Sequence, residues 1–314
     1  MCPPCQEPGS GARILSGLSR PQRGVRPPAP YTIDVSRTLP FLLLACSALP
    51  SMIALPALAQ PDAQPVSTGQ AMVERALANE LAAAEDRNHP MRYQLRKTSP
   101  RLTTTKEIIE TADGDVARLV AVGDHPLDAH GQAREAARLN ELAANPARQR
   151  RRKQSEEEDT GRALKVLCAL PRAFLYRDAG PLQGPAGLVE RFTFQSNPDF
   201  SPSNLETEVL PAMRGEIWID PAHLRVVRLE ASVERDVDFG WGILGRLNRG
   251  GWLVIEQADV GQGQWRTVRF QMRMTGRVVF KTRVFDTTEE QTRYAPVPVG
   301  LGYREAIATL LTGR

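Results

Sequence analysis

The chain has few cysteines and no long uninterrupted apolar run, and each scarcity excludes a class of protein. Four cysteines in 314 residues are too few for a small domain held together by a disulfide framework. The longest apolar stretch, residues 39–58, is interrupted by three prolines, whereas a membrane-spanning helix needs about 20 consecutive apolar residues. A chain that is 41% hydrophobic and 24% charged is also neither wholly disordered nor a polytopic membrane protein.

Familiar catalytic motifs are also missing. The sequence contains no nucleophile elbow, no zinc-protease helix and no phosphate-binding loop. These absences do not exclude an enzyme, but no residue pattern identifies a reaction or a cofactor. We therefore expect no cofactor and no catalytic residues.

Residues 37–59 have the pattern of a secretory signal peptide. Arg37 precedes the apolar stretch, and Ala57-Leu58-Ala59 has the small-x-small form that precedes cleavage. We expect cleavage after Ala59, a polar linker over residues 60–68 and a periplasmic location. Residues 1–36 are rich in proline, glycine and arginine, and are either a disordered extension or the result of a mis-called start codon. Leu43-Leu44-Ala45-Cys46 partly resembles a lipobox, so a lipoprotein anchored at Cys46 is the alternative.

Removal of this leader changes the charge balance. The whole chain has a net charge of +4, which would suggest a nucleic-acid or membrane partner. The leader carries five arginines and three of the four cysteines, and the remaining 255 residues have a net charge of only +1. We therefore expect no nucleic-acid partner, and Cys168, within an apolar run, to be buried.

The remaining sequence predicts an α+β fold. Helical spacing extends over residues 69–86, and residues 129–170 form a helical insert broken at Asn145-Pro146. Residues 91–122 read as antiparallel strands with a turn at 112–115, and residues 174–299 read as antiparallel β-structure throughout. Val278–Phe285 is expected to form one strand, and residues 303–311 a terminal helix. Strands and helices that are segregated along the chain favour α+β over a parallel sheet.

One stretch shows strict alternation of apolar and polar residues. In Val268–Met274, every second residue is apolar, which is typical of a strand with one buried and one wet face. Methionine adapts to irregular partners such as acyl chains, so this face would line a ligand cavity or would be ordinary core under the helices.

The chain resembles the periplasmic lipoprotein-carrier (LolA/LolB-like) superfamily over about residues 66–311. The resemblance is carried by the leader, the amphipathic first helix, and Gly215-Glu-Ile-Trp-Ile-Asp220 followed by Leu224-Arg-Val-Val-Arg-Leu-Glu230. It implies a strongly curved antiparallel sheet, an unclosed half-barrel, with helices covering the concave face, in a single domain over residues 69–314. It also implies an apolar cavity for acyl chains and no enzymatic activity.

These arguments lead to a set of candidate cavity residues. All four tryptophans lie between residues 218 and 265, and a glycine-rich segment, residues 239–252, could be a cavity lid or a tight connection between strands. The candidates are Trp218, Trp241, Leu244, Trp252, Phe270, Met272, Met274 and Phe280.

Two charged segments have competing interpretations. Asp124, His125, Asp128 and His130 could hold a metal, but an ordinary strand-to-helix connection with Asp128 near the helix start explains them equally, so we expect no metal. The basic run 148–153 is followed by the acidic run 156–159, which is typical of a solvated helical face.

The leading functional hypothesis is a periplasmic, non-enzymatic protein that binds lipid or lipoprotein acyl chains, with a role in outer-membrane lipoprotein sorting. The alternatives are an envelope-stress sensor that binds a membrane-protein partner, and a secreted hydrolase that uses His125 or Asp128.

Overall fold

The computed structural model describes residues 68–239, 245–278 and 281–313. The predicted leader, the linker up to residue 67 and Cys46 lie outside these residues, as do Trp241, Leu244 and Phe280. No helix among the described residues is long and apolar enough to span a membrane.

Four helices, two short 3₁₀ segments and thirteen strands make up the described part of the chain. In chain order these are α1 (Thr68–Glu85), β1 (Met91–Thr98), β2 (Thr103–Ile109), β3 (Val116–Val122), β4 (His125–Pro126), α2 (Ala129–Ala144), α3 (Pro146–Ala173), β5 (Phe174–Gly184), β6 (Gly187–Ser196), η1 (Leu205–Thr207), η2 (Leu210–Ala212), β7 (Met213–Asp220), β8 (Arg225–Val233), β9 (Val237–Phe239), β10 (Gly245–Leu247), β11 (Trp252–Asp259), β12 (Trp265–Val278), β13 (Lys281–Pro296) and α4 (Tyr303–Thr312).

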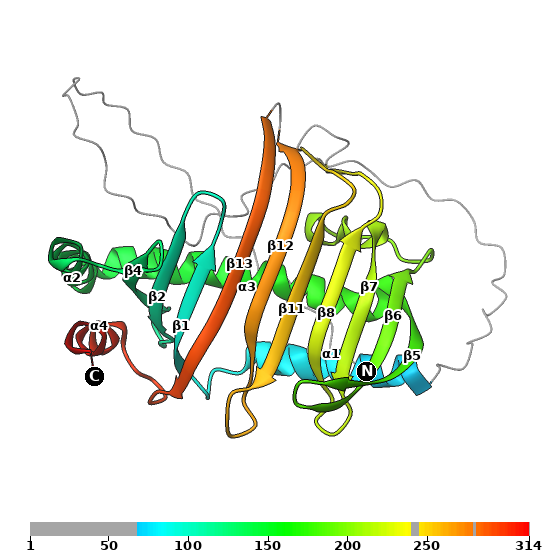
Figure 1. Cartoon of the computed structure of the whole chain (residues 1–314), viewed down its shortest axis with the longest axis horizontal. Coiled ribbons are helices and arrows are strands. Elements are labelled where there is room, and N and C mark those ends of the chain that lie inside the picture. The colour runs from blue at the N-terminus through cyan, green and yellow to red at the C-terminus, as the bar shows by residue number, and fades with distance from the viewer. Residues whose placement is uncertain (1–67, 240–244, 279–280, 314) are drawn as a thin grey trace, which may run out of the picture. The chain divides into compact units, whose positions relative to one another are not determined.

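The strands form one antiparallel sheet that does not close into a barrel (Figure 1). Its strand order is β4-β3-β2-β1-β13-β12-β11-β8-β7-β6-β5, and the short strands β9 and β10 pair with each other and with β12. The last strand, β13, lies between β12 and β1, so the first and the last strand of the described chain pair with each other within the sheet. The predicted α+β fold with a curved, open antiparallel sheet is confirmed.

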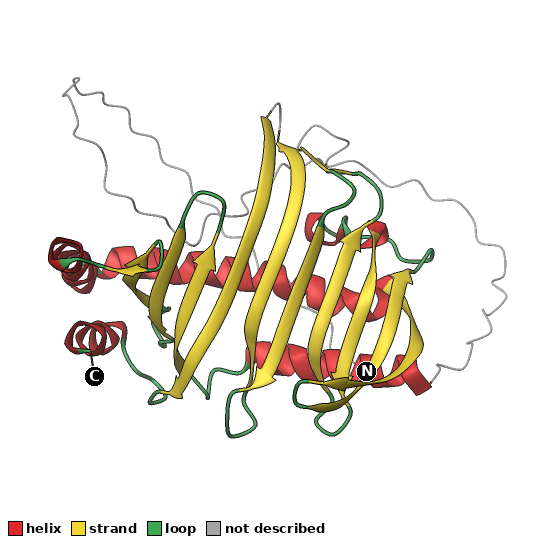
Figure 2. Cartoon of the chain, viewed as in Figure 1, coloured by secondary structure: helices red, strands yellow, loops and turns green. Residues whose placement is uncertain are grey.

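Helices α1 and α3 cover the concave face of this sheet (Figure 2). Helix α1 presents Val73, Ala76 and Leu77, each no more than 3% exposed, which lie at the i, i+3, i+4 positions of a single helix face. Helix α3 begins at Pro146, as the sequence predicts, because proline is well suited to a first helical position. Its Arg152–Glu156 and Lys153–Glu157 pairs, each 3.8 Å apart, neutralise the adjacent basic and acidic runs.

The apolar side chains form two separate clusters. The first, at the β5–β8 end, joins α1 and α3 to the sheet and includes Phe192, Ile217 and Ile219. The second, at the β2–β3 end, joins α2 and α4 to Ile109 and Val116. The first cluster extends into the middle of the sheet through Leu253, Met272, Met274 and Phe285, and the candidate site lies where this cluster ends on β11 to β13.

Two expectations about element boundaries are wrong. Pro171 does not end α3, which continues to Ala173. Bonds from elsewhere hold this last turn, since Gln70 donates to the Pro171 carbonyl and Tyr176 to that of Leu170. Val278–Phe285 is not one strand either, because β12 ends at Val278 and pairs with Lys281 at the start of β13. The run of apolar residues contains no turn signal that would reveal the reversal.

Candidate functional site

The central part of the concave face carries an apolar patch on three neighbouring strands. Ile255 on β11 is paired with Phe270 on β12, and Leu253 with Met272. Met274 is paired with Phe285 on β13. Cross-strand partners point to the same side of a sheet, so these six side chains form one continuous surface, which we call the central patch.

Burial differs across the central patch. Met274 is 8% exposed and belongs to the first cluster, and Met272, Leu253 and Phe285 pack against that cluster. Ile255 and Phe270 are half-buried and belong to neither cluster. Large apolar side chains that face the helices without joining a core are available to a ligand.

The predicted tryptophans do not share this face. Trp218 alternates with Ile217 and Ile219, which point into the first cluster, and the guanidinium of Arg228 lies over its ring at 5.2 Å. Trp252 is 38% exposed and alternates with Leu253 in the same way. Both side chains therefore lie on the opposite, helix-free face, and we remove them from the candidate set. Phe270, Met272 and Met274 remain in it.

Charged groups border the central patch on the side of β1 and β2. Glu289 is the cross-strand partner of Phe270 and pairs with Lys97 at 2.7 Å. Lys106 lies two residues along β2 from Thr104, the partner of Lys97. The concave face thus changes from apolar to charged within three strands.

Burial disturbs the protonation of two groups in this charged part. Burial, reinforced by Arg138, Arg152 and Lys97, lowers the pKa of Lys106 to about 8. Burial, reinforced by the carboxylates of Glu156 and Glu110, raises the pKa of Asp115 to about 7. No sequence pattern indicates either shift, because both depend on how α3 lies over β2 and β3.

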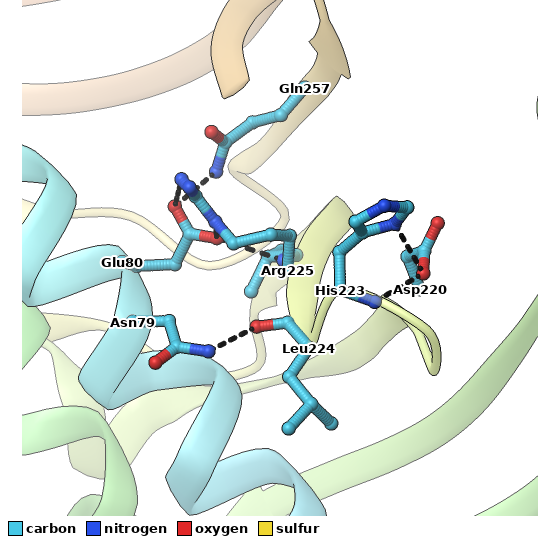
Figure 3. A network of polar contacts seen from close by, with 8 residues as sticks. Asn79, Glu80, Asp220, His223, Leu224, Arg225 and Gln257 are labelled. Atoms are coloured by element: carbon cyan, nitrogen blue, oxygen red, sulfur yellow. Dashed lines mark hydrogen bonds and ion pairs between the residues drawn. The ribbon is translucent and has the colours of Figure 1, made fainter. Parts of the chain in front are cut away.

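A buried carboxylate fixes α1 to the sheet at the border of the central patch (Figure 3). Glu80 is 8% exposed and accepts two bonds from Arg225, at 2.8 and 3.0 Å. It also accepts one from the Val226 backbone N–H at 2.9 Å and one from Gln257 at 3.0 Å. Asn79 adds a bond to the Leu224 carbonyl at 3.0 Å. Glu80 therefore adds a buried polar anchor to the apolar packing that holds α1 over β8 and β11.

The opposite face of the sheet is polar and carries a shallow hollow of about 380 Å³. It is lined by Leu175, Arg177, Thr193, Phe194, Gln195, Arg214, Gly215, Glu216 and Ser232. Nearby, Arg228 forms ion pairs with Glu230 and Glu256. No sequence pattern predicts this hollow, which mixes charges of both signs.

The segment around His125 serves a structural role in the described part of the chain. Asp124 forms a two-bond ion pair with Arg96, both bonds at 2.9 Å, and Asp128 caps α2 by accepting from the Gly131 N–H at 2.6 Å. No three His, Cys, Asp or Glu side chains among the described residues are grouped to hold a metal. Cys168, expected to be buried, is half-buried in α3.

No family model and no curated protein sequence matches the chain. Two solved structures resemble it weakly. A LolA superfamily protein from Nitrosomonas europaea aligns at 9% identity and a TM-score of 0.27, over 72% of this chain and 92% of its own. A DUF1329 family protein from Desulfovibrio piger aligns at 9% identity and a TM-score of 0.29, over 76% of this chain and 96% of its own. At such TM-scores the superpositions carry no argument about function, which has to rest on this chain's own residues.

Proposed function

We propose that the protein is a periplasmic, non-enzymatic carrier that binds acyl chains of lipids or lipoproteins on the central patch. The observation that supports this most is the pair Ile255 and Phe270, which face the helices and yet lie outside both apolar clusters. The neighbouring Met272 adds a flexible side chain that can follow an acyl chain, and Met274, buried in the first cluster, forms the floor beneath it. The predicted residues Trp241, Leu244 and Phe280 stay in the proposal as candidates.

Acyl-chain binding is tested with a fluorescent fatty acid. Phe270→Ser replaces a half-buried aromatic ring by a small polar group and should weaken binding about tenfold or more, since burial of a large apolar side chain is worth about 1.5–3 kcal/mol. Trp252→Ser is the matched control, because it removes a larger aromatic ring from the adjacent strand but on the opposite face. Equal loss in both variants, or no binding by the unaltered protein, would contradict the proposal.

Native mass spectrometry of protein purified from the cell envelope tests the same proposal without an added probe. The unaltered protein should carry lipid, and Phe270→Ser should carry less.

Export is tested separately: the proposed signal peptide predicts that protein from a periplasmic extract begins at Gln60. A mature N-terminus at Cys46 would instead support the lipoprotein alternative.

A role in outer-membrane lipoprotein sorting is the finer part of the proposal. It predicts that a purified lipoprotein, but not the same lipoprotein stripped of its acyl chains, forms a complex with this protein. An acyl-free partner that binds equally well would favour the interaction-module alternative.

A further inference from the structure

The charged end of the concave face contains a lysine that is half-buried and unpaired. Lys106 on β2 is opposite Leu95 on β1, and Leu95 alternates with Arg96 so that it shares a face with Lys97 and hence with Glu289 and Phe270. The ammonium group of Lys106 therefore points to the same side of the sheet as the central patch. No hydrogen bond or ion pair links it to another described residue, although its side chain is half-buried.

The cations around Lys106 differ in how many of their donors already have a hydrogen-bond or ion-pair partner. Lys97 is paired with Glu289 at 2.7 Å. Arg138 is bonded to Glu135 at 2.7 Å and to the Ala117 carbonyl at 2.6 Å. Arg152 forms an ion pair with Glu156 at 3.8 Å and donates to the Asp115 carbonyl at 3.5 Å, but its Nε is buried without a hydrogen-bond partner in the described part of the chain. Lys106 and the Nε of Arg152 are therefore open donors. The charges that act on Lys106 are mostly positive, whereas the carboxylates of Glu156 and Asp115 lie beside Arg152.

An unpaired buried charge is unfavourable unless something neutralises it. The surrounding carboxylates do so only in part: Glu135 attracts Lys106 but is bonded to Arg138, and Glu289 is bonded to Lys97. The low pKa of Lys106, about 8, reflects burial and the neighbouring cations. A bound anion would remove this penalty.

The distance from this charge to the central patch suits an amphiphile. Phe270, Glu289, Lys97 and Thr104 lie opposite one another on four successive strands. Three strand spacings separate Phe270 from Thr104, about 14 Å, and Lys106 lies two residues further along β2. A molecule that spans this interval on the concave face meets apolar side chains at one end and open cationic donors at the other.

We infer that Lys106 and Arg152 bind the anionic head group of an amphiphile whose acyl chain occupies the central patch. The inference rests on the proposed function and narrows the ligand to a carboxylate or phosphate amphiphile. A fatty acid and a lysophospholipid with a free phosphate share this chemistry, and the experiment below separates them.

The test measures binding of palmitic acid, methyl palmitate and palmitoyl lysophosphatidate by equilibrium dialysis of the full mature chain. Methyl palmitate has the same acyl chain as palmitic acid and no charge. We expect palmitic acid to bind about tenfold more tightly than its ester, because a charge-assisted hydrogen bond is worth about 1.5–3 kcal/mol. Tighter binding of lysophosphatidate than of palmitic acid would identify phosphate as the preferred head group.

Two variants of equal charge change locate the effect. Lys106→Gln should reduce palmitic-acid affinity about tenfold, to that of the ester, and leave the ester's affinity unchanged. Lys281→Gln, at the exposed start of β13, also removes one positive charge and should change neither. Lys106→Arg should retain the preference for the acid.

The outcomes distinguish the two proposals. If neither acid nor ester binds, the proposed function fails. If both bind with equal affinity, or if Lys106→Gln weakens both alike, the acyl-chain site stands and the head-group assignment is overturned. A thermal melt of each variant shows that the comparison is between folded proteins.

Discussion

The ion pair that holds α1 on the sheet gives the sharpest stability prediction. Glu80→Gln keeps the size of the side chain but removes its charge, and it places an NH₂ group among donors that Glu80 now accepts from. Glu80 accepts four hydrogen bonds, two of them from Arg225, and the two side chains are only 9% and 13% exposed. Loss of one partner from a buried ion pair costs about 3–5 kcal/mol, because the other charge stays buried. The Gln side chain of Glu80→Gln retains one acceptor oxygen, so we expect the free energy of unfolding to fall by about 3 kcal/mol, the low end of this range.

The assay is urea unfolding followed by circular dichroism, with hydrogen exchange of α1 amides as a local readout. For a domain of this size each kcal/mol lowers the melting temperature by about 2–4 °C, so the variant should melt about 6–12 °C lower. The amides of α1 should exchange faster than those of β7 and β8, because the lost bonds join this helix to the sheet.

Two control variants make the result specific. The double replacement Glu80→Met with Arg225→Met removes both charges and should recover most of the lost stability. Asp238→Asn breaks the exposed pair with Arg246, in which both side chains are 41% exposed, and should leave stability unchanged. A loss of less than about 1 kcal/mol in Glu80→Gln, or a double variant worse than the single one, would refute the argument.

Four further variants test packing and electrostatics in the sheet and in α3. Asp115 has a pKa of about 7 against its usual 3.8, so its ionisation progressively destabilises the fold as the pH rises from 3.8 to 7. Asp115→Asn should therefore raise the free energy of unfolding by about 2–4 kcal/mol at pH 8 and should not change it near pH 3. Lys106 has a pKa lowered to about 8, so its protonated form destabilises the fold fully below that pH and progressively less toward pH 10.5. Lys106→Met should therefore raise the free energy of unfolding by about 1–3 kcal/mol at pH 7 and should lose this gain in alkaline solution. A Cβ at Gly215 would lie 1.8 Å from the Glu230 carbonyl oxygen, so Gly215→Ala should lower the free energy of unfolding by about 3 kcal/mol. Gly161 lies within α3 with open space around it, so Gly161→Ala should raise the free energy of unfolding by about 1 kcal/mol. Denaturant titrations check all four, over the stated pH ranges for Asp115→Asn and Lys106→Met. A pH-independent Asp115→Asn effect would exclude its titration as the cause.

Local periodicity was sufficient to predict most elements. The helical spacing in residues 69–86 puts Val73, Ala76 and Leu77 on one face, and the structure buries all three. The alternation over Val268–Met274 correctly places Phe270, Met272 and Met274 together. Val268 departs from the pattern, because a register shift in the β11–β12 pairing leaves it without a partner.

The side to which each strand turns its tryptophan could not be predicted from local pattern. Ile217, Trp218 and Ile219 are consecutive apolar residues, so a strand made of them looks apolar on both faces. The pairing with neighbouring strands decides that the isoleucines face the helices and Trp218 faces Arg228. Trp252 follows the same rule, paired with Ser232 and Arg273 on the polar face.

The head-group end of the site had no sequence signal at all. Lys106 is the single lysine in β2, among three threonines, a glutamate and two isoleucines, and such a lysine is typical of an ordinary exposed strand position. It shares the concave face with Phe270 because β13, from the end of the chain, pairs with β1 near its beginning. A contact made by residues so far apart in sequence cannot be read from any local window.

The claim that acyl chains occupy the concave face is tested most directly by crosslinking from two adjacent residues of β12. p-Benzoylphenylalanine is introduced at Phe270, which faces the helices, or at Gln271, which faces the opposite side, and the protein is irradiated with radiolabelled palmitic acid. We expect strong labelling from position 270 and background labelling from position 271. Equal labelling from both positions, or stronger labelling from position 271, would contradict the account.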